Sequence, residues 1–322
     1  MPDFISDMEQ PWSRGKVWRR KLLYPAHTLP TAAAPLLVAV GLAAHDQVLA
    51  LPAAFLAFIA GWLIQVGGVL TDNYENLLHE PEDQEHPELV RALKLGTLSL
   101  AELRVAIMVS YSIALLIGSY LLYSAGPFVL LIGVLSIAAS WAYSAGPWPI
   151  GRHGLADPLF FLFFGVVSVV GGYYVQAAPV LGATWDSWLV LDALSASALA
   201  LGVPIGALTT NILIIDDIRD REFDAVKGKH SVAVRFGNAW SRAEFLALLL
   251  IAYVVPLCLW LVLGFSAWIL LPWLTAPYAV ATARIVLTLH RYEDLVPVTP
   301  QAGRLLLFYA LLLAIGAAAP SS

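Results

Sequence analysis

Long apolar runs alternate with short polar segments along this 322-residue chain. Nine of these runs are close in length to the about 20 residues that an α-helix needs to cross a bilayer. They lie at 29–45, 49–70, 104–123, 127–143, 158–177, 187–215, 244–264, 266–286 and 303–319. The pattern predicts an all-α, multi-pass membrane protein with nine transmembrane helices.

Two of the apolar runs end in matching polar stripes. Residues 71–80 read TDNYENLLHE and residues 215–224 read IDDIRDREFD, and their polar positions superpose under a shift of 144 residues. The matched positions are Asp72 with Asp216, Asn73 with Asp217, Asn76 with Asp220 and Glu80 with Asp224. Helix positions i, i+3 and i+7 share one face, so each segment is expected to carry a polar stripe at the membrane edge.

The internal repeat organises the chain. After each stripe the sequence returns to a basic residue, a glycine and a new helix, at 88–99 and at 231–241. We expect two such units to face each other around a central cavity. A Gly- and Pro-rich segment at 143–158 is expected to be partly non-helical and to cap the cavity from the side. We expect a single transmembrane domain at 29–322, preceded by a cytoplasmic segment at 1–28.

Composition supports a membrane location. Hydrophobic residues make up 59% of the chain and charged residues 13%, and the mean hydropathy is +0.75. These values lie well outside soluble globular usage. The only cysteine is Cys258, which excludes disulfides and Cys-based metal sites. The N-terminal residues lack the pattern of a signal peptide, and no nucleic-acid-binding patch is implied.

Basic residues test the topology, because Lys and Arg in short loops mark the cytoplasmic side of a membrane protein. With nine spans, all 18 Lys and Arg fall on one side. We therefore expect an integral protein of a bacterial or archaeal cytoplasmic membrane. Its N-terminus and both acidic stripes are expected on the cytoplasmic side, and its C-terminus on the far side.

The acidic stripes are candidates for a metal and phosphate site. Two carboxylates about 4 Å apart repel by roughly 4 kcal/mol at an effective dielectric near 20, which favours cation binding. Mg²⁺ prefers one or two protein carboxylates together with waters and substrate phosphates. The expected metal ligands are Asp72, Glu80, Asp217, Asp220 and Asp224. Nearby cations suit a diphosphate, since metal and basic groups together neutralise its charge. A solvated charged surface is the alternative interpretation.

Further residues share the faces of these stripes or lie in the capping segment. Gln65 lies on the face of Asp72, and Thr210 on the face of Asp217. Expected substrate-binding residues are Asn73, Asn76, Lys94, Gln65, Thr210, Tyr143 and Arg152. Aromatic residues at 160–164 and 173–174 are suited to shielding a carbocation, and are also common in lipid-facing and core positions. Arg219, Arg221 and Glu222 are expected to project away from the stripe.

The motifs resemble the UbiA superfamily of intramembrane prenyltransferases over nearly the whole chain. The segment DDIRDREFDAVKGKHSVAVRFG at 216–237 is similar to that family's second Asp-rich motif. The segment YSAGPWPIGRHGLADPLFFLFFGVVSVVGGYYVQ at 143–176, with 91–99, resembles the branch that prenylates 1,4-dihydroxy-2-naphthoate.

The resemblance implies nine helices around a cavity, two Mg²⁺ ions between the Asp motifs and a prenyl diphosphate donor. It implies that Asp220 and Asp224 are the metal-binding pair of the second motif, with Asp217 at the preceding polar position. We expect Arg91 and Lys229 to support the departing diphosphate, beside Asp220 and Asp224 in the catalytic set. The first motif departs from the family pattern, because Asp72 and Asn73 are exchanged and Asn76 replaces an Asp.

Three alternatives stay open at this level. The same fold can use another acceptor or none, as a lipid-ether-forming transferase or a terpene cyclase does. Internal repeats with acidic residues also occur in membrane transporters, although here the acids lie at the helix ends. The amides of Asn73 and Asn76 leave room for a non-catalytic family member. The leading hypothesis is a Mg²⁺-dependent transfer of a prenyl group to a small aromatic acceptor within membrane lipid.

Overall fold

Helices form every regular element in residues 13–23, 28–79 and 87–320, which are the residues that the computed structural model describes. In chain order they are α2 (Arg14–Val17), η1 (Trp18–Leu23), α3 (Thr28–His45), α4 (Leu51–His79), α5 (Pro87–Lys94), α6 (Leu100–Ala125), α7 (Pro127–Ser144), η2 (Ile150–His153), α8 (Ala156–Phe160), η3 (Phe161–Val167), α9 (Ser168–Val180), η4 (Leu191–Ala193), α10 (Ala196–Val226), α11 (Val232–Phe236), α12 (Asn238–Val262), η5 (Ala267–Thr275), α13 (Ala276–Thr288), α14 (Tyr292–Leu295) and α15 (Val298–Ala318). The predicted all-α class is confirmed.

The predicted membrane spans have helical counterparts. Among the described residues, eight helical segments are long and apolar enough to cross a membrane, and Leu29–His45 forms a shorter apolar helix. Two helices extend beyond the ends of their apolar runs, since α4 continues to His79 and α10 to Val226. The described parts of both polar stripes therefore lie on the last turns of long helices.

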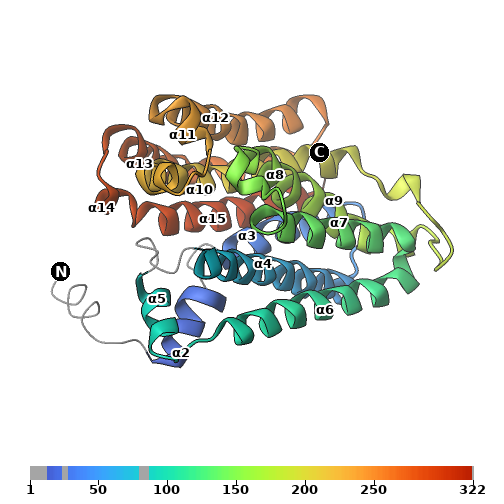
Figure 1. Cartoon of the computed structure of the whole chain (residues 1–322). Coiled ribbons are helices and arrows are strands. Elements are labelled where there is room, and N and C mark those ends of the chain that lie inside the picture. The colour runs from blue at the N-terminus through green and yellow to red at the C-terminus, as the bar shows by residue number, and fades with distance from the viewer. Residues whose placement is uncertain (1–12, 24–27, 80–86, 321–322) are drawn as a thin grey trace.

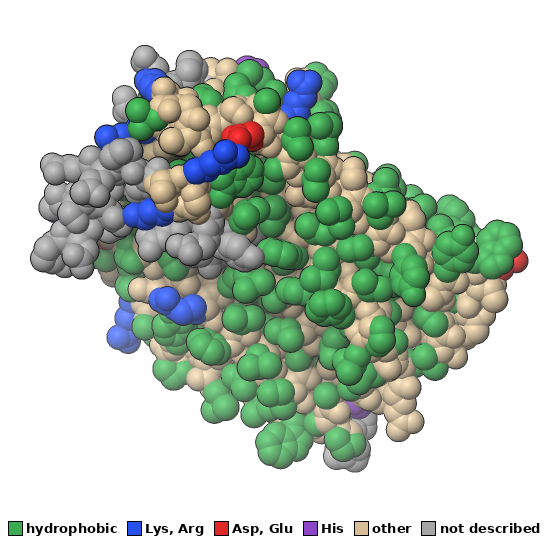
Figure 2. All heavy atoms as spheres, turned by 90° about the horizontal axis from the view of Figure 1, so that it is seen from below, with side chains coloured by type: hydrophobic (Ala, Val, Ile, Leu, Met, Phe, Trp, Pro, Cys, Tyr) green, Lys and Arg blue, Asp and Glu red, His purple; other side chains and the backbone are tan. Residues whose placement is uncertain are grey.

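The long helices run side by side, with the short helices α2, α5 and α14 at one end of the bundle (Figure 1). Helix α10 is central, because 83% of its most apolar stretch is buried, against 6% for α7 and 17% for α6. Hydrophobic side chains cover most of the outer face in Figure 2, and Lys and Arg gather at one end. Such a surface suits contact with lipid around its middle.

Helix α10 approaches η3 very closely. A Cβ atom added at Gly206 would lie 2.6 Å from the carbonyl oxygen of Phe161, and one added at Gly202 would lie 2.8 Å from the Cα of Val166. Small residues allow helix backbones to meet in this way in membrane proteins. The crossing holds the cavity wall formed by η3 against the helix that carries the second acidic stripe.

The N-terminal helical segment packs beside α5. Val17 and Leu22 are buried in one apolar cluster with Leu89 of α5 and Leu98. Helix α6 then begins with a capping box between Ser99 and Glu102, and Glu102 also pairs with Arg14. Because α5 turns its apolar face into this cluster, its basic residues face outward.

Candidate active site

A cavity of about 590 Å³ opens between the long helices. Most of its wall is apolar and comes from α3, α4, α6, α7, α9 and α10. Its charged residues are Asp72, Asp216, Asp217, Arg219, Asp220 and Lys229. All of these lie in the last turns of α4 and α10 or just after α10, so one end of an apolar chamber is strongly polar.

The two halves of the repeat line this cavity at equivalent positions. From α4 the lining includes Gln65, Gly68, Val69, Asp72 and Asn73. From α10 it includes Thr209, Ile212, Leu213, Asp216 and Asp217, which are the same positions shifted by 144 residues. The repeat seen in the sequence thus places two matching helix faces on one chamber.

Asp72 accepts one hydrogen bond from α7 and one from its own helix, α4. The Ser144 hydroxyl donates a hydrogen bond to its Oδ1 at 2.6 Å, and the Asn76 amide donates to its Oδ2 at 3.4 Å. Asn73 is buried and donates to the Val69 carbonyl oxygen at 2.7 Å. Its amide nitrogen is used inside the helix, while its carbonyl oxygen is the group suited to a cation.

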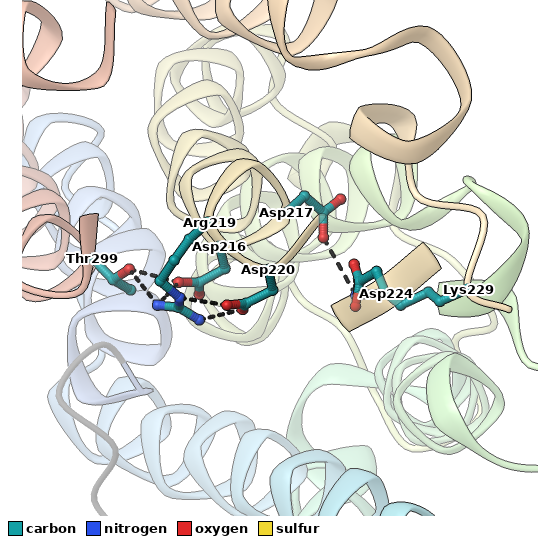
Figure 3. A network of polar contacts seen from close by, with 7 residues as sticks. All are labelled: Asp216, Asp217, Arg219, Asp220, Asp224, Lys229 and Thr299. Atoms are coloured by element: carbon teal, nitrogen blue, oxygen red, sulfur yellow. Dashed lines mark hydrogen bonds and ion pairs between the residues drawn. The ribbon is translucent and has the colours of Figure 1, made fainter. Parts of the chain in front are cut away.

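A second group of contacts joins α10 to α15. Arg219 pairs with Asp216 at 2.6 Å and with both carboxylate oxygens of Asp220. The Thr299 hydroxyl donates to Asp216 at 2.6 Å (Figure 3). The guanidinium fork suits a carboxylate that it binds through two nitrogens, so Asp216 and Asp220 are held side by side at the cavity wall.

Lys229 organises the remaining carboxylates of the second stripe. Its ammonium group lies 3.4 Å from Asp217 and 3.1 Å from Asp224 (Figure 3). Burial opposes its charge, but the nearby Asp217, Tyr143 and Asp224 outweigh that effect and hold the pKa of Lys229 well above its usual value. The surrounding groups therefore favour the charged form of the lysine.

A smaller pocket of about 90 Å³ adjoins the polar end. Asp72, Tyr143 and Lys229 border both cavities, whereas Arg152, Lys227 and Asp224 border only the smaller one. The backbone joins the two loops that bring these cations together, since the His230 amide donates to the Arg152 carbonyl oxygen at 2.9 Å. Three cations against two carboxylates make this pocket suited to an anion.

The large cavity has the opposite balance. Four carboxylates and two cations give its lining a formal charge of −2. Within the described ranges, no three His, Cys, Asp or Glu side chains converge as a ready metal cage. Mg²⁺ does not need such a cage when substrate phosphates and waters complete its coordination. The donor set of carboxylates and amide oxygens therefore fits a magnesium ion that binds together with a phosphorylated ligand.

Most of the residues predicted from the sequence meet at this site. Those that line the large cavity are Gln65, Asp72, Asn73, Tyr143, Asp217, Asp220 and Lys229. Those that line only the small pocket are Asn76, Arg152 and Asp224. Glu80 lies outside the described residues.

Three predicted residues are not among those that line either cavity. Arg91 and Lys94 are exposed on α5, because that helix buries Leu89, Val90 and Ala92 instead. Thr210 is buried, and its hydroxyl donates to the Gly206 carbonyl oxygen at 2.8 Å. The neighbouring Thr209 lines the cavity in its place.

Sequence reasoning misplaced Arg219 and missed Thr299. The expectation that Arg219 projects away from the stripe is wrong, since its side chain returns to Asp216 and Asp220. The i, i+3 spacing from Asp216 was the available signal. Thr299 comes from the last long helix, and no local pattern connects it to the acids.

Three aromatic side chains of the predicted group line the cavity, namely Phe160, Phe163 and Phe164. The Phe160 ring lies 5.5 Å from that of Tyr143 and 4.9 Å from that of Phe164, between centroids. Tyr173 and Tyr174 are buried in the core. The aromatic wall beside Tyr143 can therefore present ring faces to a positive charge in the cavity.

Comparison with known sequences identifies relatives over nearly the whole chain. The model of the UbiA prenyltransferase family matches residues 32–312. The chain is 30% identical to the 1,4-dihydroxy-2-naphthoate octaprenyltransferase of Mycobacterium tuberculosis over 290 residues, which cover 89% of this chain and 92% of that protein. It is also 30% identical to the Escherichia coli enzyme of the same name over 303 residues, with 92% of each chain covered.

Solved structures share the fold at lower identity. A UbiA homologue from Aeropyrum pernix K1 superposes with a TM-score of 0.64 at 17% identity, covering 92% of this chain and 98% of that one. A UbiA homologue from Archaeoglobus fulgidus bound to DMAPP and Mg²⁺ superposes with a TM-score of 0.57 at 15% identity, with the same coverage. At these identities the likeness concerns the fold.

Proposed function

Because this chain belongs to the UbiA prenyltransferase family, we propose that it transfers a prenyl group from a prenyl diphosphate to an aromatic acceptor of the 1,4-dihydroxy-2-naphthoate class. It is an integral membrane prenyltransferase, and the transporter alternative does not agree with that membership. One observation carries the proposal. Matching faces of α4 and α10 bring acidic side chains to the polar end of an apolar cavity.

The donor diphosphate is proposed to lie where the two cavities meet. Lys229 borders both, and Arg152 and Lys227 line the anion-suited side. Asp72, Asp217, Asp220 and Asp224 would hold Mg²⁺ beside it, with Asn73 and Asn76 as neutral oxygen donors and Glu80 as a further predicted ligand. When bound, Mg²⁺ neutralises charge on the diphosphate and so assists its departure.

Different residues of the chain then stabilise the two products of ionisation, which are the diphosphate and the prenyl cation. Lys229, Arg152 and Lys227 stabilise the departing diphosphate by charge. Breakage of the allylic C–O bond leaves a prenyl cation in the apolar chamber, where the rings of Tyr143, Phe160 and Phe164 favour positive charge. An electron-rich carbon of the acceptor attacks this cation and a C–C bond forms. The ring then regains aromaticity by releasing H⁺ from that carbon, or CO₂ where that carbon carries the naphthoate carboxylate.

Orientation in the membrane belongs to the same proposal. Figure 2 places Lys and Arg at one end of the bundle, and basic residues mark the cytoplasmic side. The polar end of the cavity is therefore proposed to face the cytoplasm and to receive the diphosphate end of the donor from there. The prenyl tail then extends along apolar walls toward lipid, within one transmembrane domain at 29–322.

Product identification tests the proposed function. Purified protein receives a labelled prenyl diphosphate and Mg²⁺ with a naphthoate, a benzoate or no acceptor, and products are identified by mass spectrometry. We expect a prenylated naphthoate. A prenylated benzoate would move the protein to another acceptor class, a cyclic hydrocarbon without acceptor would make it a cyclase, and no product under any condition would favour a non-catalytic role.

A further inference from the structure

Two side-chain oxygens in the cavity wall have no hydrogen-bond partner among the described residues. They are the amide oxygen Oε1 of Gln65 and the hydroxyl Oγ1 of Thr209, and both are buried from solvent. Leaving a buried polar atom unpaired costs about 1–3 kcal/mol. Two other hydroxyls of the same cavity have partners within the protein, since Ser140 donates to the Ile64 carbonyl oxygen and Ser168 to that of Phe163.

Gln65 and Thr209 occupy equivalent places in the repeat. Gln65 lies seven residues before Asp72, and Thr209 lies seven residues before Asp216. Seven residues are about two helical turns, or about 10 Å along the axis. Both residues line the same cavity as the acids, so the pair lies at one depth on two helices, below the diphosphate end.

Part of the remaining cavity wall is apolar. From α6, α7 and α9 it includes Gly118, Leu130, Gly133 and Gly171. A Cβ atom added at Gly133 would meet nothing within 4 Å. These glycine and leucine positions leave apolar space that suits a hydrocarbon tail, which offers no hydrogen-bond partner to an amide or a hydroxyl.

We propose that Gln65 and Thr209 recognise the ring hydroxyl groups of the aromatic acceptor and determine its specificity. An amide oxygen accepts a hydrogen bond from a phenolic O–H, and a threonine hydroxyl both donates and accepts. A ring with two hydroxyls satisfies both residues at once, and it lies between them and the diphosphate. The inference rests on the proposed function, because it assigns the acceptor's place within the same cavity.

The variants Thr209→Val and Gln65→Met remove the hydrogen-bonding groups with little change of shape. Each is assayed with 1,4-dihydroxy-2-naphthoate and with its analogues lacking one hydroxyl. We expect kcat/KM for the dihydroxy acceptor to fall about tenfold per lost hydrogen bond, with an unchanged KM for the prenyl diphosphate. Each variant should also lose the wild-type preference for at least one acceptor hydroxyl, because the side-chain group that formed a hydrogen bond with that hydroxyl has been removed.

Two further variants separate recognition from a structural effect. Thr209→Ser keeps the hydroxyl and should retain the acceptor preference. Thr282→Val removes a buried hydroxyl that donates to the Tyr278 carbonyl oxygen on α13, and it should leave the acceptor preference unchanged. Equal losses with all acceptors, or a raised KM for the diphosphate, would overturn the inference. Failure of the wild-type protein to prenylate any naphthoate would instead overturn the proposed function.

Discussion

Arg219 shows how much of the site depends on a single side chain. It is the cation that lies between Asp216 and Asp220, and its side chain is only 17% exposed. Removing one partner from a buried ion pair typically costs about 3–5 kcal/mol, because a charge is left unpaired. The arginine therefore stabilises the acidic wall in the absence of other cations.

We predict that Arg219→Leu lowers the thermal stability of the purified protein in detergent, and that Mg²⁺ restores part of the loss by supplying charge to Asp216 and Asp220. Arg221→Leu is the matched control, since Arg221 is exposed on the same helix. Unfolding followed by intrinsic fluorescence measures both. Equal melting temperatures for the Arg219→Leu and Arg221→Leu proteins would refute this role.

At this scale the sequence was informative where chemistry is local. Helical spacing was enough to group Asp217, Asp220 and Asp224, and the repeat located Asp72. It failed for Arg219, whose long side chain reaches around the helix, and for Thr299, whose contact with Asp216 depends on how α15 packs. It also chose Thr210 over Thr209, because one residue turns a side chain by about 100°.

At the scale of elements, the crossing of η3 and α10 is the contact least tolerant of change. It depends on Gly202 and Gly206, where an added Cβ would strike backbone atoms rather than mobile side chains. Backbone cannot move aside as readily as the end of a side chain. The crossing also sets the distance between the aromatic wall and the acidic helix.

Gly206→Ala is expected to destabilise the protein by about 1–3 kcal/mol through overpacking. Gly133→Ala, where a Cβ meets nothing within 4 Å, should be neutral or slightly stabilising. Thermal denaturation of the two variants in the same detergent makes the comparison. Equal melting temperatures would mean that the helices separate at no cost.

Apolar runs predicted the helices themselves, and the reason is the bilayer, which requires every spanning backbone to satisfy its own hydrogen bonds. Helix ends were less predictable. α4 and α10 continue well past their apolar runs, because a helix projecting from the membrane needs no hydrophobic surface. The outward turn of α5 followed from packing with the N-terminal segment, which the polar pattern of Arg91 and Lys94 did not indicate.

At the scale of the whole molecule, the repeat gives one chamber with two matched walls of unequal charge. The α10 wall carries three carboxylates into the large cavity, while the α4 wall carries Asp72 and the amide of Asn73. The unequal number of carboxylates on the two walls could be read from the sequence, because it follows directly from the residue types at the matched positions. It could not give the size of the chamber or the second, anion-suited pocket beside it.

Membrane orientation is a prediction at this scale. In a Cys258→Ser background, a cysteine at Glu222 should react with a membrane-impermeant maleimide only after cells are permeabilised. A cysteine at Asp186, an exposed residue between the end of α9 and the start of α10, should react in intact cells. The reverse labelling pattern would place the polar end of the cavity on the outer side of the membrane.

The most direct test of the central claim is label transfer from a prenyl diphosphate to 1,4-dihydroxy-2-naphthoate by purified Asp220→Asn protein, beside wild type and Glu222→Gln. Asp220 is buried at the cavity, whereas Glu222 is an exposed acid on the same helix. We predict that Asp220→Asn lowers the rate at least about a hundredfold, that Glu222→Gln keeps it, and that EDTA stops wild-type transfer until Mg²⁺ is restored. Transfer by Asp220→Asn at the wild-type rate, or undiminished transfer in EDTA, would contradict the account.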